Sequence, residues 1–335
     1  MYNCPSQNPG GRMKILHHIY ITSALAAAIT LPQAAAQNQW PNKPIRMTVS
    51  SGAGGGLDFV SRLIATPLTE ALGQSVVVDN RAGASGSIAA DVTAHSAPDG
   101  YTVMMLSASL VVYGIVAKTP YDLYRDFDAV SQVAGGPYIL TVHPSLPVKS
   151  VAELVAYAKA NPSKLNFAST GNASLAHLAG ELFGQSTGTR VTHIPYKGVG
   201  AAMTDMLSGQ VQFSFLSGGS IYSQVRSGKL RALAIASNKR AKVAPEIPTM
   251  IEAGVPGYTV TQWHGMVAPR GTPKPIIDRL YKEIVKGVQR ADVMARLEQD
   301  GTDGVASSPQ EFAAFLRAER DQWTRVVKGA GIKIE

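Results

Sequence analysis

The feature that most constrains the fold is an alternation of short apolar runs with segments whose apolar residues recur at helical spacing. The apolar runs predict strands at 44–50, 75–79, 102–106, 138–142, 165–168, 211–216 and 232–236. The intervening segments predict helices at 59–72, 86–94, 151–160, 174–187, 199–208, 275–290 and 309–329. Strands that are apolar on both faces and separated by helices indicate mostly parallel sheets covered on both sides. We therefore predict an α/β fold.

Two groups of turn residues divide this pattern. Gly135-Gly136-Pro137 precedes an apolar run, and Gly254 to Tyr258 contains Gly-Val-Pro-Gly. A segment bounded by two such breaks is typical of a second lobe inserted into a first. We predict one lobe from 37–137 plus 258–335 and a second lobe from 138–257.

The first 36 residues are organised like a secretory signal peptide. Lys14 and the pair His17-His18 precede an apolar run at 19–31, and Ala34 to Ala36 form a small-residue cleavage site before Gln37. The apolar run is too short to span a bilayer as a resident helix. We predict cleavage between Ala36 and Gln37 and release into the periplasm; a short buried N-terminal helix is the alternative.

Export excludes several classes of function. A periplasm supplies no NAD or ATP, and the only cysteine, Cys4, lies upstream of the predicted cleavage site, so thiol chemistry is excluded as well. The net charge of +8 is scattered and forms no basic stripe with interleaved aromatic residues, which argues against nucleic-acid binding. Histidines with zinc-ligand spacing are absent from the sequence. We expect a monomer without cofactor or metal.

A glycine-rich loop, Ser50–Asp58, follows the first predicted strand and opens the first predicted helix. Glycines let the backbone approach a ligand closely, and the amides at a helix N-terminus favour an anion. Asp58 is predicted to be the N-cap of the helix. A dinucleotide fingerprint does not fit, because Leu57 takes the place of its third glycine and the acid Asp79 comes late. The loop residues assigned to anion binding are Gly52, Ala53, Gly54, Gly55 and Asp58.

A second loop, Ser169–Ser174, has the same position between a strand and a helix. Its hydroxyl-bearing residues Ser169, Thr170 and Ser174 add to the backbone amides. In open parallel sheets, ligands bind at the carboxyl ends of the strands. If the carboxyl ends of the strands before the two loops face each other, they would form a binding site for a carboxylate. The alternative is that both loops are ordinary strand-to-helix turns without a ligand.

Ser174 and His177 also allow a secreted hydrolase, since they share one helical face. The glycine that follows the serine of a nucleophile elbow is missing, however. We expect His177 to be a helix histidine bonded to a neighbouring loop, His193 to end a strand, and His264 to line a cleft.

Several short motifs occur along the chain in the same order as in one known family. They lie at Trp40–Arg46, Gly73–Gly83, Pro98–Thr102, His193–Gly198, Gly228–Ala234, Glu252–Tyr258 and Ala268–Pro273. With these motifs the chain resembles the periplasmic substrate-binding proteins of tripartite tricarboxylate transporters, the Bug family, over nearly all of its exported part.

The resemblance implies a two-lobed, type II-like Venus-flytrap fold without catalytic activity. The ligand, a carboxylate, would lie between the lobes and be delivered to a two-subunit membrane permease. The family's contact loops match Gly52–Asp58 together with Ser169, Thr170, Ser174 and His177. Ser107 and Ser217, which follow two further predicted strands, are added to the site.

Two departures from the family bear on the ligand. The Pro-Phe-Pro-Pro-Gly-Gly type of first loop is replaced by Ser50–Gly55, which lacks the prolines and the aromatic residue. Leu216 occupies the position at which many members of the family carry an acidic residue, which could pair with the ammonium group of a ligand. The resemblance therefore implies a dicarboxylate, a tricarboxylate or an aromatic acid rather than an amino acid. An orphan binding protein that feeds a signalling system is a further alternative.

Overall fold

The computed structural model describes residues 1–3, 40–299 and 301–332. The predicted signal peptide and its cleavage site lie outside these residues. The chain divides into two units, Met1–Asn42 and Lys43–Glu335, and the helices and strands described below belong to the second.

The secondary structure alternates as the sequence pattern indicates. The strands are β1 (Ile45–Val49), β2 (Val76–Asn80), β3 (Thr102–Ser107), β4 (Phe127–Val142), β5 (Asn166–Ser169), β6 (Thr192–Pro195), β7 (Phe213–Ser217), β8 (Arg231–Ile235), β9 (Thr261–Pro269) and β10 (Asp303–Gly304). The helices are α2 (Gly56–Leu72), a 3-10 turn (Ala84–Gly86), α3 (Ser87–Ala94), α4 (Ala108–Val116), α5 (Val151–Ala160), α6 (Leu175–Thr187), α7 (Val199–Leu207), α8 (Gly218–Arg226), α9 (Lys274–Val288), α10 (Ala291–Gln299) and α11 (Pro309–Ala330).

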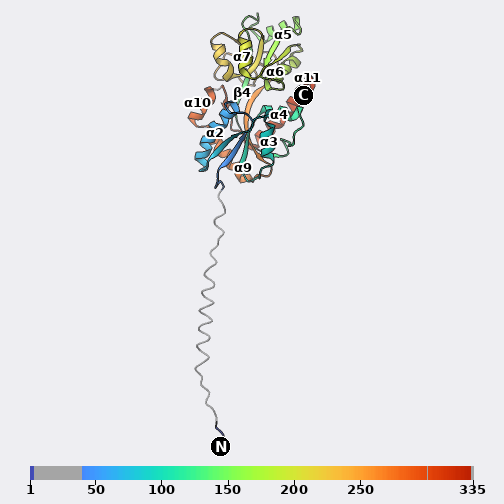
Figure 1. Cartoon of the computed structure of the whole chain (residues 1–335). Helices are drawn as coiled ribbons and strands as arrows, with labels where there is room; N and C mark the ends of the chain where they lie inside the picture. Colours follow the sequence, from blue (N-terminus) through green and yellow to red (C-terminus); the bar gives the residue numbers. More distant parts are fainter. Residues whose placement is uncertain (4–39, 300, 333–335) are drawn as a thin grey trace. The chain divides into compact units, whose positions relative to one another are not determined.

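The strands form two sheets that share β4. Sheet A has the order β2-β1-β3-β9-β4, with β10 also on β4, and sheet B has the order β4-β7-β5-β6, with β8 also on β4. Pro137 is the last residue of β4 that pairs with β9, and Tyr138 is the first that pairs with β7. Figure 1 shows β4 between the helices α5, α6 and α7 and the helices α2, α3 and α9.

The direction of β4 decides where the carboxyl ends of the other strands lie. β3 and β4 both run antiparallel to β9, so β4 runs in the same direction as β1 and β3 and leaves sheet A at their carboxyl edge. In sheet B, β4 runs antiparallel to β7, which is parallel to β5, and β5 is parallel to β6. β4 therefore enters sheet B at the carboxyl edge of those strands, and the two carboxyl edges face each other across the crossing.

The structure contains elements that the sequence pattern did not predict. β9 and the first part of β4 are long antiparallel strands, and the expected break at Gly135–Pro137 lies inside β4. Glycines and polar residues at buried positions, such as Gly265 and His264, conceal the strand pattern of β9. Helices α4, α8 and α10 were also missed. The predicted lobe boundaries at 137/138 and 257/258 stay a proposal.

A buried carboxylate ties the C-terminal helix to sheet A. Glu319 of α11 accepts hydrogen bonds from the indole nitrogens of Trp263 on β9, at 2.8 Å, and of Trp323, at 3.0 Å. Phe312 of the same helix lies against Gly265, where a Cβ would come within 2.1 Å of the ring. Burial raises the pKa of Glu319, and the two indole hydrogen bonds oppose that shift.

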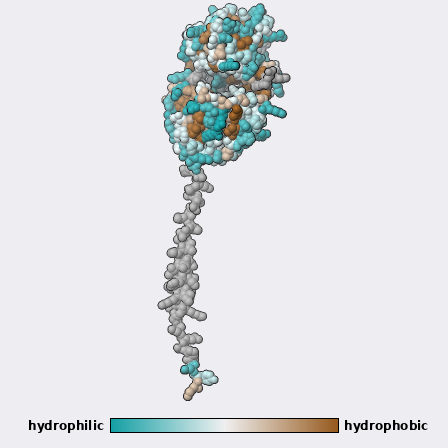
Figure 2. All heavy atoms as spheres, in the orientation of Figure 1, coloured by the Kyte–Doolittle hydropathy of each residue, from teal (hydrophilic) through white to brown (hydrophobic). Residues whose placement is uncertain are grey.

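Outside this core, polar and apolar residues are interspersed on the face shown in Figure 2.

Glu319→Leu should lower the free energy of unfolding by about 2–5 kcal/mol, because two buried indole N–H groups lose their acceptor. Glu319→Gln keeps an acceptor oxygen in the same place and should lose less than half as much. Urea unfolding followed by far-UV circular dichroism measures both. Equal losses for the two variants would contradict the bridging role of this carboxylate.

Candidate functional site

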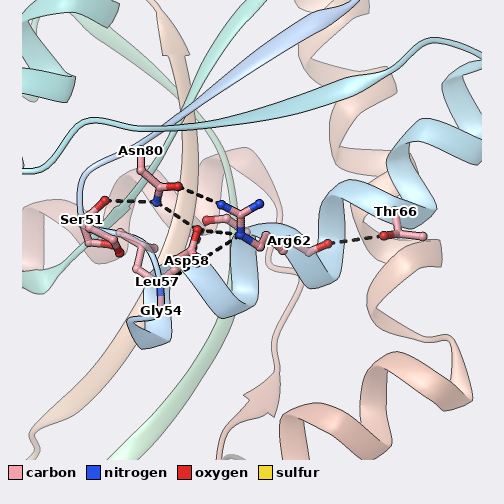
Figure 3. Close-up of polar contacts among 9 residues, drawn as sticks. Ser51, Gly54, Leu57, Asp58, Arg62, Thr66 and Asn80 are labelled. Atoms are coloured by element: carbon pink, nitrogen blue, oxygen red, sulfur yellow. Dashed lines mark hydrogen bonds and ion pairs between the residues drawn. The ribbon is translucent and has the colours of Figure 1, made fainter.

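The side chain of Asp58 holds the glycine-rich loop in place (Figure 3). The Asp58 carboxylate accepts hydrogen bonds of 2.9 Å from the backbone nitrogen of Gly54, from Nε of Arg62 and from Nδ2 of Asn80. Asn80 also donates to the carbonyl of Ser51 at 3.2 Å. The side chain of Asp58 is therefore enclosed, with 4% of the residue exposed, while Gly52, Ala53, Gly54 and Gly55 are exposed.

The prediction that Asp58 is the N-cap of the first helix is wrong. Helix α2 begins at Gly56, its N-cap is Gly55, and that residue makes no side-chain capping bond. Asp58 occupies the third helical position instead, from which it reaches back to Gly54. Burial by itself raises the pKa of Asp58, but the hydrogen bonds from Arg62, Gly54 and Asn80 bring the pKa below its ordinary value. Asp58 thus stays ionised and shapes the loop.

The second loop is capped and folded on itself. Ser174 is the N-cap of α6, and its Oγ accepts from the backbone nitrogen of His177 at 3.2 Å. Ser169 is fully buried, and its Oγ lies 3.0 Å from the carbonyl oxygen and 3.1 Å from the amide nitrogen of Gly171. Thr170 is partly exposed at the tip. In the first turn of α6, the amides of Leu175 and Ala176 precede the first intrahelical donor, Leu178, so no carbonyl of the helix accepts from them.

A pair of stacked histidines lies beneath this loop. The rings of His177 and His193 are parallel within 6°, with centroids 3.6 Å apart, and Phe167 contacts both of them, with its centroid 5.0 Å from that of His193 and 6.3 Å from that of His177. Nε2 of His193 is 2.6 Å from Oγ of Ser169. Burial, and then the neighbouring His177, lower the pKa of His193 to about 4, so the ring is neutral at neutral pH. His193 was expected to end a strand; it is instead the second residue of β6, and its stacking on His177 is not visible in the sequence.

The geometry does not support a Ser174–His177 catalytic pair. Nδ1 of His177 accepts from the backbone nitrogen of Ala173 at 3.0 Å, and its Nε2 lies 3.6 Å from Oε1 of Glu181. Oγ of Ser174 meets the backbone of His177 rather than its ring. A general base needs a free lone pair within reach of the nucleophile's proton, and neither ring nitrogen offers one to Ser174.

Ser107 and Ser217 are N-caps of α4 and α8, and neither makes a side-chain capping bond. Oγ of Ser217 lies 3.2 Å from Oγ of Ser220. The first turn of α8 is covered by the turn before β10, since a Cβ on Gly301 would come within 2.5 Å of the nitrogen of Gly219.

The crossing of β4 brings the helix N-termini of both sheets to one place. α2 and α4 follow β1 and β3 at the carboxyl edge of sheet A, and α6, α7 and α8 follow β5, β6 and β7 at that of sheet B. The unpaired first-turn amides and the positive dipole ends of such helices suit an anion. In residues 40–299 and 301–332, the structure shows no group of three His, Cys, Asp or Glu side chains that could hold a metal ion. None of the helices it describes is long and apolar enough to cross a bilayer.

Comparison with known proteins gives consistent matches. The family model of the tripartite tricarboxylate transporter family receptor, TctC, matches residues 60–332. Protein BugT of Bordetella pertussis is 38% identical over 312 residues, which cover 92% of this chain and 95% of that protein.

Two solved structures share the fold. Rpa4515 of R. palustris, solved with adipate, has a TM-score of 0.76 at 35% identity, covering 88% of this chain and 99% of that one. MatC from Rhodopseudomonas palustris, with bound malate, has a TM-score of 0.73 at 30% identity, covering 86% and 100%. The predicted two-lobed α/β fold and the absence of an enzymatic role are thereby confirmed. The chain belongs to the family of tripartite tricarboxylate transporter receptors, the periplasmic solute-binding proteins that include the Bug proteins.

Proposed function

We propose that the exported protein binds an aliphatic dicarboxylate between its two sheets and presents it to a two-subunit permease of the tripartite tricarboxylate type. One carboxylate is held by the first turn of α2 and the glycine-rich loop, and by the Ser169–Ser174 loop with the first turn of α6. Closure of the two lobes around the acid produces the form that the permease recognises. Cleavage of the leader between Ala36 and Gln37 is part of this proposal.

The proposal rests on the positions of α2 and α6, which follow strands at the carboxyl edges of sheets A and B. Both helices begin at the facing carboxyl edges. The residues of the two loops, 50–56 and 169–174, include no lysine or arginine. Binding by neutral amides and hydroxyls therefore suits a carboxylate without requiring a counter-ion.

The ligand class rests on the relatives and on one position of this chain. The structures of Rpa4515 and MatC were solved with adipate and malate, which are both aliphatic dicarboxylates. Leu216, which is buried at the end of β7, supplies no charge for an ammonium group. These observations favour a dicarboxylate over an amino acid.

A thermal-shift screen of the chain starting at Gln37 tests the proposal. Malate, adipate, citrate, benzoate and glutamate are compared at equal concentration and pH. A dicarboxylate at about 100 times its Kd should stabilise the native state by about 2.7 kcal/mol and raise Tm by several degrees. A response to glutamate alone, or to none of the acids, would contradict the proposal.

The hydrogen bonds of Asp58 predict that this residue acts by positioning the loop. Asp58→Ala removes one acceptor from each of the Gly54 amide, Arg62 and Asn80, so it should lower the free energy of unfolding by about 1–3 kcal/mol. It should also weaken binding of the acid identified in the screen at least tenfold, as measured by calorimetry.

The matched control is Asp278→Ala. Asp278 also forms an i,i+4 pair with a basic residue, Lys274, but it is exposed on α9. It should change stability by less than about 1 kcal/mol and leave affinity unchanged. Wild-type affinity in Asp58→Ala would show that the loop does not need this residue to bind its ligand.

A further inference from the structure

His264 lies in the centre of sheet A at its carboxyl edge. On β9, it pairs with Ser107 at the end of β3 and with Ala134 on β4. Paired residues of neighbouring strands point to the same face of a sheet, so the side chains of His264 and Ser107 share a face. His264 is 2% exposed.

The same face receives the first residue of α2. A Cβ built on Gly56 would lie 3.6 Å from Nε2 of Gln262 and 4.0 Å from both Cε1 and Nε2 of His264. The carboxamide and the imidazole therefore contact the start of the helix whose N-terminal amides we assign to the ligand. Glycine at this position permits the close approach without displacing either side chain.

The imidazole has one nitrogen without a partner. Nε2 of His264 lies 3.4 Å from Nε2 of Gln262, and a carboxamide nitrogen can only donate; we therefore assign Nε2 of His264 as the acceptor and the ring proton to Nδ1. Across residues 40–299 and 301–332, no side chain or backbone group hydrogen-bonds to this buried Nδ1. A buried N–H without an acceptor destabilises the protein that carries it, so its presence calls for an explanation.

The ring is uncharged under ordinary conditions. Burial lowers the pKa of His264 to about 4, so at neutral pH it offers a neutral N–H. A neutral donor beside a helix N-terminus can bind an anion, and it adds no buried charge to the protein when the ligand is absent.

We propose that His264, positioned by Gln262, is a ligand-binding residue of sheet A, whose Nδ1–H donates to a carboxylate oxygen of the bound acid or to a water that bridges to it. This inference rests on the proposed function and extends it: sheet A then contributes a side-chain donor beneath the first turn of α2, in addition to that turn's backbone amides. The strand that carries His264 also pairs with β4, so the donor has a fixed place relative to the crossing between the sheets.

Replacing the ring by one without nitrogen separates binding from structure. His264→Phe keeps an aromatic ring in the buried slot and removes the unpartnered N–H. In the ligand-free protein, Tm should stay within one or two degrees of wild type or rise. Affinity for whichever of malate, adipate, citrate or benzoate stabilises the wild type most should fall about tenfold or more in calorimetry.

Two further variants complete the test. His264→Asn retains a donor and should bind within a few fold of wild type, while His95→Phe replaces the exposed histidine at the C-cap of α3 and should bind as wild type does. A merely structural His264 would give the reverse pattern: a ligand-free Tm lowered by several degrees in His264→Phe, with affinity unchanged. Either of those two results overturns the inference. If the wild type responds to no acid, the proposed function fails and the inference fails with it; if wild type and His264→Phe respond equally, the inference alone fails.

Discussion

The passage of one strand from sheet A to sheet B determines the rest of the structure. Since β4 leaves sheet A at the carboxyl edge of β1 and β3 and enters sheet B at that of β5 and β7, the strand-to-helix turns of both sheets are directed toward each other. Each turn opens a helix, so the crossing gathers positive dipole ends and unpaired amides at one place. The anion binding that we propose follows from this topology without a lysine or arginine side chain in either loop.

The two loops are supported by different means. Asp58 holds the glycine-rich loop through its hydrogen bonds to Gly54, Arg62 and Asn80. The loop of sheet B rests on the stacked pair of His177 and His193 and is capped by Ser174. In both places a residue that sequence reasoning assigns to the ligand is bonded to the protein's own backbone. The donors left for a ligand are therefore mainly backbone amides, which favours a rigid geometry for binding.

The sequence predicts those parts of the structure that local patterns report. Apolar runs and helical spacing located β1, β3, β5 and β7 with their following turns, and hence both candidate loops. β9 was missed because its glycine and its buried polar residues interrupt the strand pattern, and Gly135–Pro137 resembles a break although it lies within β4. The hydrogen-bond partners of Asp58 and His177 could not be predicted from the sequence either. The residue type alone does not reveal that each side chain bonds to the backbone of its own loop. His264 is expected from the sequence to line a cleft, but only the register of β9 with β3 places it opposite Ser107.

A crystal structure of the exported chain with its stabilising acid tests the central claim most directly. The account predicts one carboxylate whose oxygens lie about 2.7–3.2 Å from first-turn amides of both α2 and α6. An acid that touches only one of the two sheets, or that is held by lysine or arginine side chains away from these turns, would contradict it.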